Sequence, residues 1–119
     1  MATFTTGDLL PYLAPAAVLA FLLFRNLRGK TEKADIPQLA KDGAVFVDVR
    51  TPAEFAAGSR PGSLNIPLDT LEARAGELDK EKTIVLSCAS GARSGYGLII
   101  LRRLGFKRVV NGGSWQNTL

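Results

Sequence analysis

The sequence predicts an α/β fold in which a small parallel sheet is flanked by helices and preceded by one transmembrane helix. Aliphatic runs at 44–48, 83–87 and 106–110 have the length and β-branched content of short buried strands. Helical patterns separate these runs, and strands that alternate with helices favour βαβ units and a parallel sheet. The chain has 119 residues, 46% of them hydrophobic, which is enough for one domain with a core.

The N-terminal part contains an apolar run, residues 9–24, that carries no charge and is followed by Arg25, Arg28 and Lys30. A helix of this length spans about 24 Å, and flanking arginines that reach the headgroups make up the rest of a bilayer core. Basic residues after the run place its C-terminal side in the cytoplasm by the positive-inside rule. An interfacial helix, a cleaved signal and a core helix are the alternatives.

The run sets the expected domain organisation. We expect a short N-terminal segment at 1–8, a transmembrane helix at 9–27, a linker at 28–34 and a domain at 35–119. The lipid bilayer is then a partner through residues 9–27. The protein is expected to be a single-pass membrane protein whose domain lies in the cytoplasm, which agrees with a reduced thiol.

Cap residues place the first two helices of the domain. Asp35 followed by Pro37 predicts a helix that ends at Gly43. The sequence Thr-Pro-Ala-Glu at 51–54 is a capping box with proline at the first helical position, and Gly58 ends that helix.

Three further features are expected in the second half of the domain. Asp69 can cap a helix that contains Leu71, Leu78 and the charged residues between them. Residues 94–104 read as a largely buried helix, in which Gly95 and Gly97 indicate close backbone packing. The sequence Asn-Gly-Gly at 111–113 predicts a turn after the last strand.

Cys88 is the only cysteine, and the chain contains no histidine. A lone cysteine forms no internal disulfide, and a free thiol favours a reducing compartment. Without an imidazole base, Cys-His and Ser-His-Asp hydrolases are excluded. One cysteine without histidine also argues against a structural zinc site, so we expect neither a metal nor a cofactor.

The net charge of +4 does not indicate a nucleic-acid partner. The three basic residues after the apolar run account for most of the excess, and the rest of the chain is nearly balanced. A small basic cluster is typical of a helix end and the loop after it, and we therefore expect no nucleic acid. Its members are Arg102, Arg103, Lys107 and Arg108.

The position of Cys88 favours an ionised sulfur. It follows a predicted strand and precedes a helix, where unpaired backbone amides converge and the helix dipole attracts negative charge. Arg93 adds a positive charge, and Ser90 and Ser94 can donate hydroxyl hydrogen bonds. We expect a lowered thiol pKa and a site for a thiolate, a persulfide or a sulfur oxyanion. The alternative is a buried, inert cysteine.

Two motifs carry a resemblance to a known family, namely D-V-R-T-P-A-E-F at 48–55 and C-A-S-G-A-R-S at 88–94, here called the cysteine loop. Gly58, Pro61-Gly62-Ser63 and Asn65-Ile66-Pro67 lie between them. With these segments the chain resembles the single-domain rhodanese (thiosulfate sulfurtransferase-like) family, here with an N-terminal membrane anchor. The family often has His-Ile where this chain has Ser59-Arg60.

The resemblance implies a sulfurtransferase, a small α/β enzyme whose cysteine accepts a sulfane sulfur and passes it on. Catalytic roles would fall to Cys88, as the persulfide carrier, and to Arg93. The substrate would bind within the cysteine loop, at Ala89, Ser90, Gly91, Ala92 and Ser94. The donor would be a thiosulfate-like anion and the acceptor a thiol or cyanide, with a protein acceptor also compatible.

Three charged residues outside the cysteine loop are also candidates for a role. Asp48 ends a strand on the side where parallel sheets place their ligands, so it is a candidate for substrate binding. Arg60 could attract an anionic donor, or it could be a solvated turn residue. Arg50 is expected to pair with Glu54 across the start of the second helix, which would be a structural contact.

Two other functions remain open from the sequence. Cysteine phosphatases and arsenate reductases resemble this site but have five residues between cysteine and arginine, whereas four separate Cys88 from Arg93. A loop that is one residue shorter should suit a sulfur atom better than a tetrahedral phosphate. A membrane-tethered domain of this fold could also act only as a binding module, but such a module has no need of the thiol.

Overall fold

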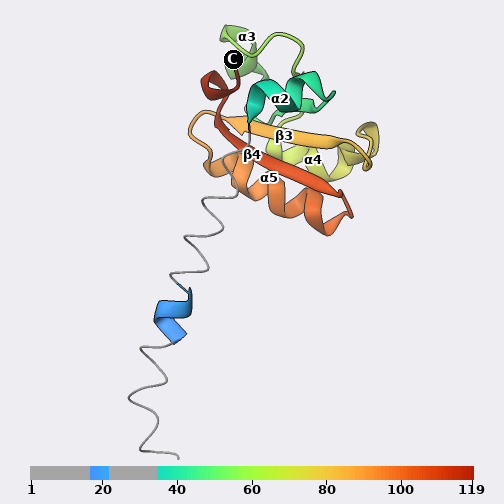
Figure 1. Cartoon of the computed structure of the whole chain (residues 1–119). Coiled ribbons are helices and arrows are strands. Elements are labelled where there is room, and N and C mark those ends of the chain that lie inside the picture. Colours follow the sequence, from blue (N-terminus) through green and yellow to red (C-terminus); the bar gives the residue numbers. More distant parts are fainter. Residues whose placement is uncertain (1–16, 22–34) are drawn as a thin grey trace, which may run out of the picture. The chain divides into compact units, whose positions relative to one another are not determined.

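The computed structural model describes residues 17–21 and 35–119 (Figure 1). Residues 17–21 are helical, and within these two described ranges no helix has the length and apolar character needed to cross a membrane. Most of the predicted transmembrane helix at 9–27, and all of the linker at 28–34, lie outside the described residues. Ala34–Leu119 forms a compact unit.

The compact unit is built on one four-stranded sheet in which every neighbouring pair of strands is parallel. This confirms the predicted α/β fold with a small parallel sheet. The order across the sheet is β2-β1-β3-β4. The strand order therefore reverses between β1 and β3, because β2 lies on one side of β1 and β3 and β4 lie on the other. The strands are β1 (Val45–Asp48), β2 (Leu64–Asn65), β3 (Thr83–Cys88) and β4 (Arg108–Ser114).

Helices cover both faces of the sheet, with α2 on one side and α4 and α5 on the other (Figure 1). The elements are α2 (Ile36–Lys41), α3 (Pro52–Ala57), α4 (Leu68–Arg74) and α5 (Ala92–Arg103), with the 3-10 turns η1 (Ala75–Glu77) and η2 (Trp115–Thr118). The predicted caps at Asp35 and Thr51 are confirmed. The predicted cap at Asp69 is wrong, because α4 begins at Leu68 and Asp69 lies in its first turn.

Alternate residues of the strands build two cores, as the pleat of a β-strand requires. On the face covered by α4 and α5, Val47, Ile84 and Leu86 pack with Leu71 and Leu101. On the opposite face, Phe46 and Val85 pack with Leu39 of α2. Cys88 belongs to the first core, so the functional candidate at the end of β3 is anchored in the packed interior.

The last strand is longer than predicted, and the sequence Asn-Gly-Gly at 111–113 lies within it. Leu86 pairs with Asn111 but Cys88 pairs with Ser114, so β4 has one residue more than β3 over this interval. This is a β-bulge, and Gly113 has the positive φ of 75° that a bulge glycine adopts. The predicted turn is therefore wrong, because the glycines bend a strand that continues.

The two glycines of α5 differ in their packing. A Cβ added at Gly97 would lie 3.1 Å from Leu86 and 3.2 Å from Leu71, so this glycine does allow close approach of the helix to the sheet. A Cβ at Gly95 would meet only the Asn111 side chain, at an ordinary 3.6 Å. The predicted close packing is confirmed at Gly97 and not at Gly95.

Candidate functional site

The candidate site lies at the carboxyl ends of the strands, where open parallel sheets place their ligands. Cys88 is the last residue of β3, and α5 begins four residues later at Ala92. Asp48 ends β1, the neighbouring strand. Cys88 therefore lies beside the point where the strand order reverses.

The sulfur of Cys88 is surrounded by hydrogen-bond donors from its own loop. The Gly91 amide donates to Sγ at 2.9 Å, and the Ser94 hydroxyl lies 3.4 Å from Sγ. Both Cys88 and Ser94 are buried, whereas Ala89, Ser90 and Ala92 are exposed. The loop thus presents polar hydrogens inward to the sulfur and small side chains outward.

These donors favour the ionised thiol. Burial raises the pKa of Cys88, but the hydroxyl and amide of Ser94 and the amides of Gly91 and Ser90 lower it by more. The pKa of Cys88 therefore lies below its ordinary value, as the sequence predicted. An anion at Sγ is stabilised without an imidazole, because the loop supplies amide and hydroxyl hydrogens instead.

Gly91 is required by the conformation of the loop. Its φ is +99°, in the left-handed region that residues with a Cβ rarely adopt. A Cβ at this position would also lie 3.2 Å from the Cα of Gly113 on β4. Glycine thus allows the loop both to turn its amide onto Cys88 and to approach the bulged strand.

Asn111 on β4 contacts the cysteine loop, although nothing in the sequence indicated that it belongs to the site. Its Oδ1 lies 2.6 Å from the Ser94 hydroxyl, which donates to it, and its Nδ2 donates to the Gly91 carbonyl at 3.1 Å. The Gly113 amide donates to the same Oδ1 at 3.0 Å. Its only sequence signal is an asparagine before two glycines, which is equally typical of a surface turn.

Arg93 forms a two-pronged ion pair with Glu54 of α3, at 2.7 and 2.9 Å between the guanidinium nitrogens and the carboxylate oxygens. This bond, together with the capping contacts of Thr51, lowers the pKa of Glu54 to about 2. The same bond raises the pKa of Arg93, with a smaller contribution from Cys88. Arg93 is thus positioned by a carboxylate from another element, and it remains electrostatically coupled to the sulfur.

Arg50 pairs with Asp48 and not with the Glu54 side chain, so the predicted Arg50–Glu54 pair is wrong. The Arg50 Nη2 lies 2.7 Å from the Asp48 carboxylate, and both side chains are buried. Arg50 also donates to the carbonyls of Glu54 and Gly58, which join α3 to the end of β1. The Asp48 carboxylate is therefore bound to Arg50, and its predicted role in substrate binding stays a prediction.

Arg60 is held by the C-terminal segment. Its Nη1 donates to the Thr118 carbonyl, and its guanidinium lies 3.9 Å from the centre of the Phe46 ring. It is half-buried, so it is not a solvated turn residue. The structure does not bring it into hydrogen-bond contact with the cysteine loop, and its predicted role in attracting a donor stays a prediction.

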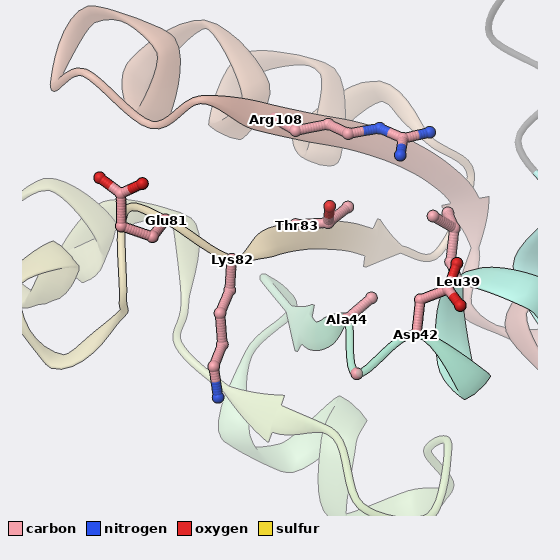
Figure 2. Close-up of a pocket in the computed structure, with 8 residues that line it drawn as sticks. Leu39, Asp42, Ala44, Glu81, Lys82, Thr83 and Arg108 are labelled. Carbon is pink, nitrogen blue, oxygen red and sulfur yellow. The ribbon is translucent and has the colours of Figure 1, made fainter.

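A separate pocket of about 330 Å³ lies at the opposite end of the strands (Figure 2). Thr83 and Arg108, which begin β3 and β4, contribute to its wall, whereas Cys88 ends β3. Leu39, Asp42 and Lys82 are also in the wall. The pocket therefore does not belong to the cysteine loop. Across residues 17–21 and 35–119, no three Cys, Asp or Glu side chains are grouped so as to hold a metal ion.

The Rhodanese-like domain family matches residues 32–117 of the chain. A sulfurtransferase of Allochromatium vinosum is 39% identical over 70 residues, which are 59% of this chain and 65% of that protein. The thiosulfate sulfurtransferase PspE of Escherichia coli is 33% identical over 74 residues, which are 60% of this chain and 71% of that protein.

Solved structures agree with this match. A rhodanese with anions from E. coli has a TM-score of 0.60 at 31% identity, and the match covers 63% of this chain and 91% of that one. The human single-domain sulfurtransferase TSTD1 has a TM-score of 0.57 at 30% identity, with 66% and 83% covered. The match spans 65% of the length of the A. vinosum sulfurtransferase, and 36% and 54% of the length of two relatives from Bacillus subtilis. Because the family match contains every strand of the sheet, this chain belongs to the rhodanese-like domain family, whose relatives include sulfurtransferases.

Proposed function

We propose that this chain is a sulfurtransferase that carries a sulfane sulfur as a persulfide on Cys88. The observation that carries the proposal is the sulfur of the only cysteine, 2.9 Å from the Gly91 amide and 3.4 Å from the Ser94 hydroxyl. These donors stabilise a thiolate, and the same donors suit the negative charge of a persulfide. The relatives named as sulfurtransferases support this assignment.

The proposed reaction consists of two transfers without net oxidation. The Cys88 thiolate attacks the outer sulfur of a thiosulfate-like donor, a sulfur–sulfur bond forms, and sulfite leaves with the electron pair of the broken bond. Cyanide, a thiol or a protein thiolate then attacks the terminal sulfur of the persulfide, and Cys88 leaves as a thiolate. Arg93 stabilises the anions that enter and leave, while Glu54 holds its guanidinium in place.

Mass spectrometry tests the persulfide directly. The full chain is incubated with thiosulfate, and the Cys88 peptide is expected to gain the mass of one sulfur, which cyanide then removes as thiocyanate. Cys88→Ser is the matched control and should gain nothing. A wild-type chain that takes up no sulfur would overturn the proposal. Release of phosphate from an aryl phosphate that depends on Cys88 would instead assign a phosphatase.

We also propose that residues 9–27 anchor the chain in a membrane, with the domain in the cytoplasm. The support is the uncharged run at 9–24 and the basic residues that follow it. The full chain is expected to stay with membranes after an alkaline wash, whereas residues 35–119 should be released. Protease added to sealed cells or spheroplasts should spare the domain. Release of the full chain by the wash would contradict the anchor.

A further inference from the structure

Asn111 connects β4 to the cysteine loop through both ends of its amide. Nδ2 donates to the Gly91 carbonyl at 3.1 Å, while Oδ1 accepts from Ser94 Oγ at 2.6 Å and from the Gly113 amide at 3.0 Å. The two ends of the amide have fixed roles, because its nitrogen can only donate and its oxygen can only accept. Asn111 pairs with Leu86, two residues before Cys88, and the bulge of β4 follows it, before Ser114 pairs with Cys88.

The Ser94 hydroxyl has a single proton and three neighbouring acceptors. These are Cys88 Sγ at 3.4 Å, the Gly91 carbonyl at 3.1 Å and Asn111 Oδ1 at 2.6 Å. When Cys88 is a thiol, its S–H can donate to Ser94 Oγ while the hydroxyl donates to Asn111. When Cys88 is ionised, the sulfur no longer carries a proton, so the hydroxyl can donate to it instead, and Asn111 Oδ1 keeps the Gly113 amide as its donor.

We infer that Asn111 is a positioning residue for Cys88. It orients the Gly91 peptide and the Ser94 hydroxyl toward the sulfur, and its Oδ1 accepts the hydrogen bond of the Ser94 hydroxyl in the thiol state. This inference rests on the proposed role of Cys88 as the sulfur carrier. No hydrogen bond joins Asn111 to the sulfur, so it acts through its two loop partners, Gly91 and Ser94.

The charged groups near the sulfur come from elements other than β4. Arg93 lies in the first turn of α5, its partner Glu54 lies on α3, and the buried Asp48–Arg50 pair lies at the end of β1. The part of β4 that faces the loop, from Val109 to Ser114, contains no charged residue. A new negative charge at position 111 would therefore be the only charge in this part of β4, and it would act directly on the nearby thiolate.

The test is a titration of Cys88 by the ultraviolet absorbance of its thiolate in the full chain, with the Cys88→Ser spectrum subtracted. Asn111→Asp keeps the shape but replaces the Nδ2 donor with an oxygen and adds a negative charge. It is expected to raise the midpoint by at least about one pH unit, which leaves about tenfold less thiolate at a fixed lower pH. Asn111→Ala, which adds no charge, should reduce the thiolate about two- to fivefold by loosening the loop.

Asn65→Ala is the matched control, because Asn65 also joins two backbone groups through its amide, the carbonyls of Asp48 and Arg50. It should weaken the fold without moving the Cys88 midpoint. Folded Asn111 variants that keep the wild-type midpoint would overturn the inference, as would an equal shift in Asn65→Ala.

A measurement on the wild-type chain covers the case in which the variants do not fold. The NMR signals of the Asn111 side-chain amide are expected to move with pH at the Cys88 midpoint, and to stay fixed in Cys88→Ser. Signals that do not follow Cys88 would overturn the inference. Neither measurement involves sulfur transfer, so an inactive protein would refute the proposed function while leaving the titration result to stand on its own.

Discussion

Gly91 has a left-handed backbone conformation and also lies close to Gly113. Comparison with a second glycine separates the contributions of these two features to stability. Gly43 has a similar φ of +86°, but a Cβ there would have no neighbour within 4 Å, whereas at Gly91 it would lie 3.2 Å from Gly113. Gly43→Ala should lower the free energy of unfolding by about 1 kcal/mol, and Gly91→Ala by about 2 kcal/mol or more.

Urea denaturation of both variants measures these losses, and titration of the thiolate measures the effect on the site. Only Gly91→Ala is expected to raise the pKa of Cys88, because it displaces the amide that donates to Sγ at 2.9 Å. Equal losses of stability, or an unchanged titration in Gly91→Ala, would show that the contact with Gly113 has no role.

Glu54 predicts a specific dependence of stability on pH. Its pKa is lowered from 4.5 to about 2 by Arg93 and Thr51, so the folded state binds a proton more weakly than the unfolded state. The stabilisation is therefore fully present above pH 4.5 and is lost as the pH falls towards 2. The difference in unfolding midpoint between wild type and Glu54→Gln should follow this profile.

Salt provides the control for this measurement. Both partners of the Arg93–Glu54 pair are about one-third exposed, at 35% and 36%, so their attraction is partly screened by solvent ions. The difference between wild type and Glu54→Gln should shrink in high salt at neutral pH. If the difference in unfolding midpoint changed neither with pH nor with salt, the stabilising effect of Glu54 would be due to packing alone.

The partners of the two arginines could not be predicted from the sequence. Glu54 lies four residues from Arg50, which is the spacing of a local helical pair, but Arg50 is directed to the nearer and buried Asp48. Arg93 and Glu54 lie 39 residues apart and meet only because β1 and β3 are neighbours in the sheet. Local spacing therefore identified the charged residues of the site but assigned one of them to the wrong partner.

At the level of elements, the sequence predicted those features whose causes are local. The capping box at Thr51, the Asp35 cap and the short apolar strands depend on neighbouring residues, and the structure confirms them. The bulge at 111–113 depends on pairing with β3, which a sequence pattern does not show. Asn111 also reaches the cysteine loop through the pairing of β4 with β3, so the sequence pattern did not show that Asn111 belongs to the site.

The two glycines of α5 give the test at this scale. Gly95→Ala should raise the free energy of unfolding by about 0.5–1 kcal/mol, because alanine favours the helix and the added methyl meets only an ordinary contact. Gly97→Ala should lower it by about 1 kcal/mol, since a methyl 3.1 Å from Leu86 overpacks the core by more than the helix gains.

Chemical denaturation of the two variants under the same conditions measures the sign of each change in the free energy of unfolding. The pair is matched because both residues lie on the same helix, two positions apart. Stabilisation by both alanines would mean that α5 can move away from the sheet without loss, and that the close approach at Gly97 is not required.

On the scale of the whole compact unit, the cysteine loop and the pocket lie at opposite ends of the strands. The carboxyl ends of the strands carry the buried Asp48–Arg50 pair, the cysteine loop and the bulge of β4. Asn111 joins β4 to the loop by hydrogen bonds, and Glu54 accepts hydrogen bonds from both Arg50 and Arg93. The other end carries the polar pocket of Figure 2, which shares no residue with the cysteine loop. Changes at the pocket should therefore leave the thiol undisturbed, whereas changes in any of the three joined features should reach it.

Ala34–Leu119 contains the whole sheet and both cores, which predicts that the domain folds without the preceding residues. Residues 35–119 expressed alone are expected to unfold in a single cooperative transition, with the same urea midpoint as the full chain in mild detergent. The Cys88 titration should also be the same, because every donor to its sulfur lies within this part. A lower midpoint, or a changed Cys88 titration, in residues 35–119 would show that the first 34 residues contribute to the domain.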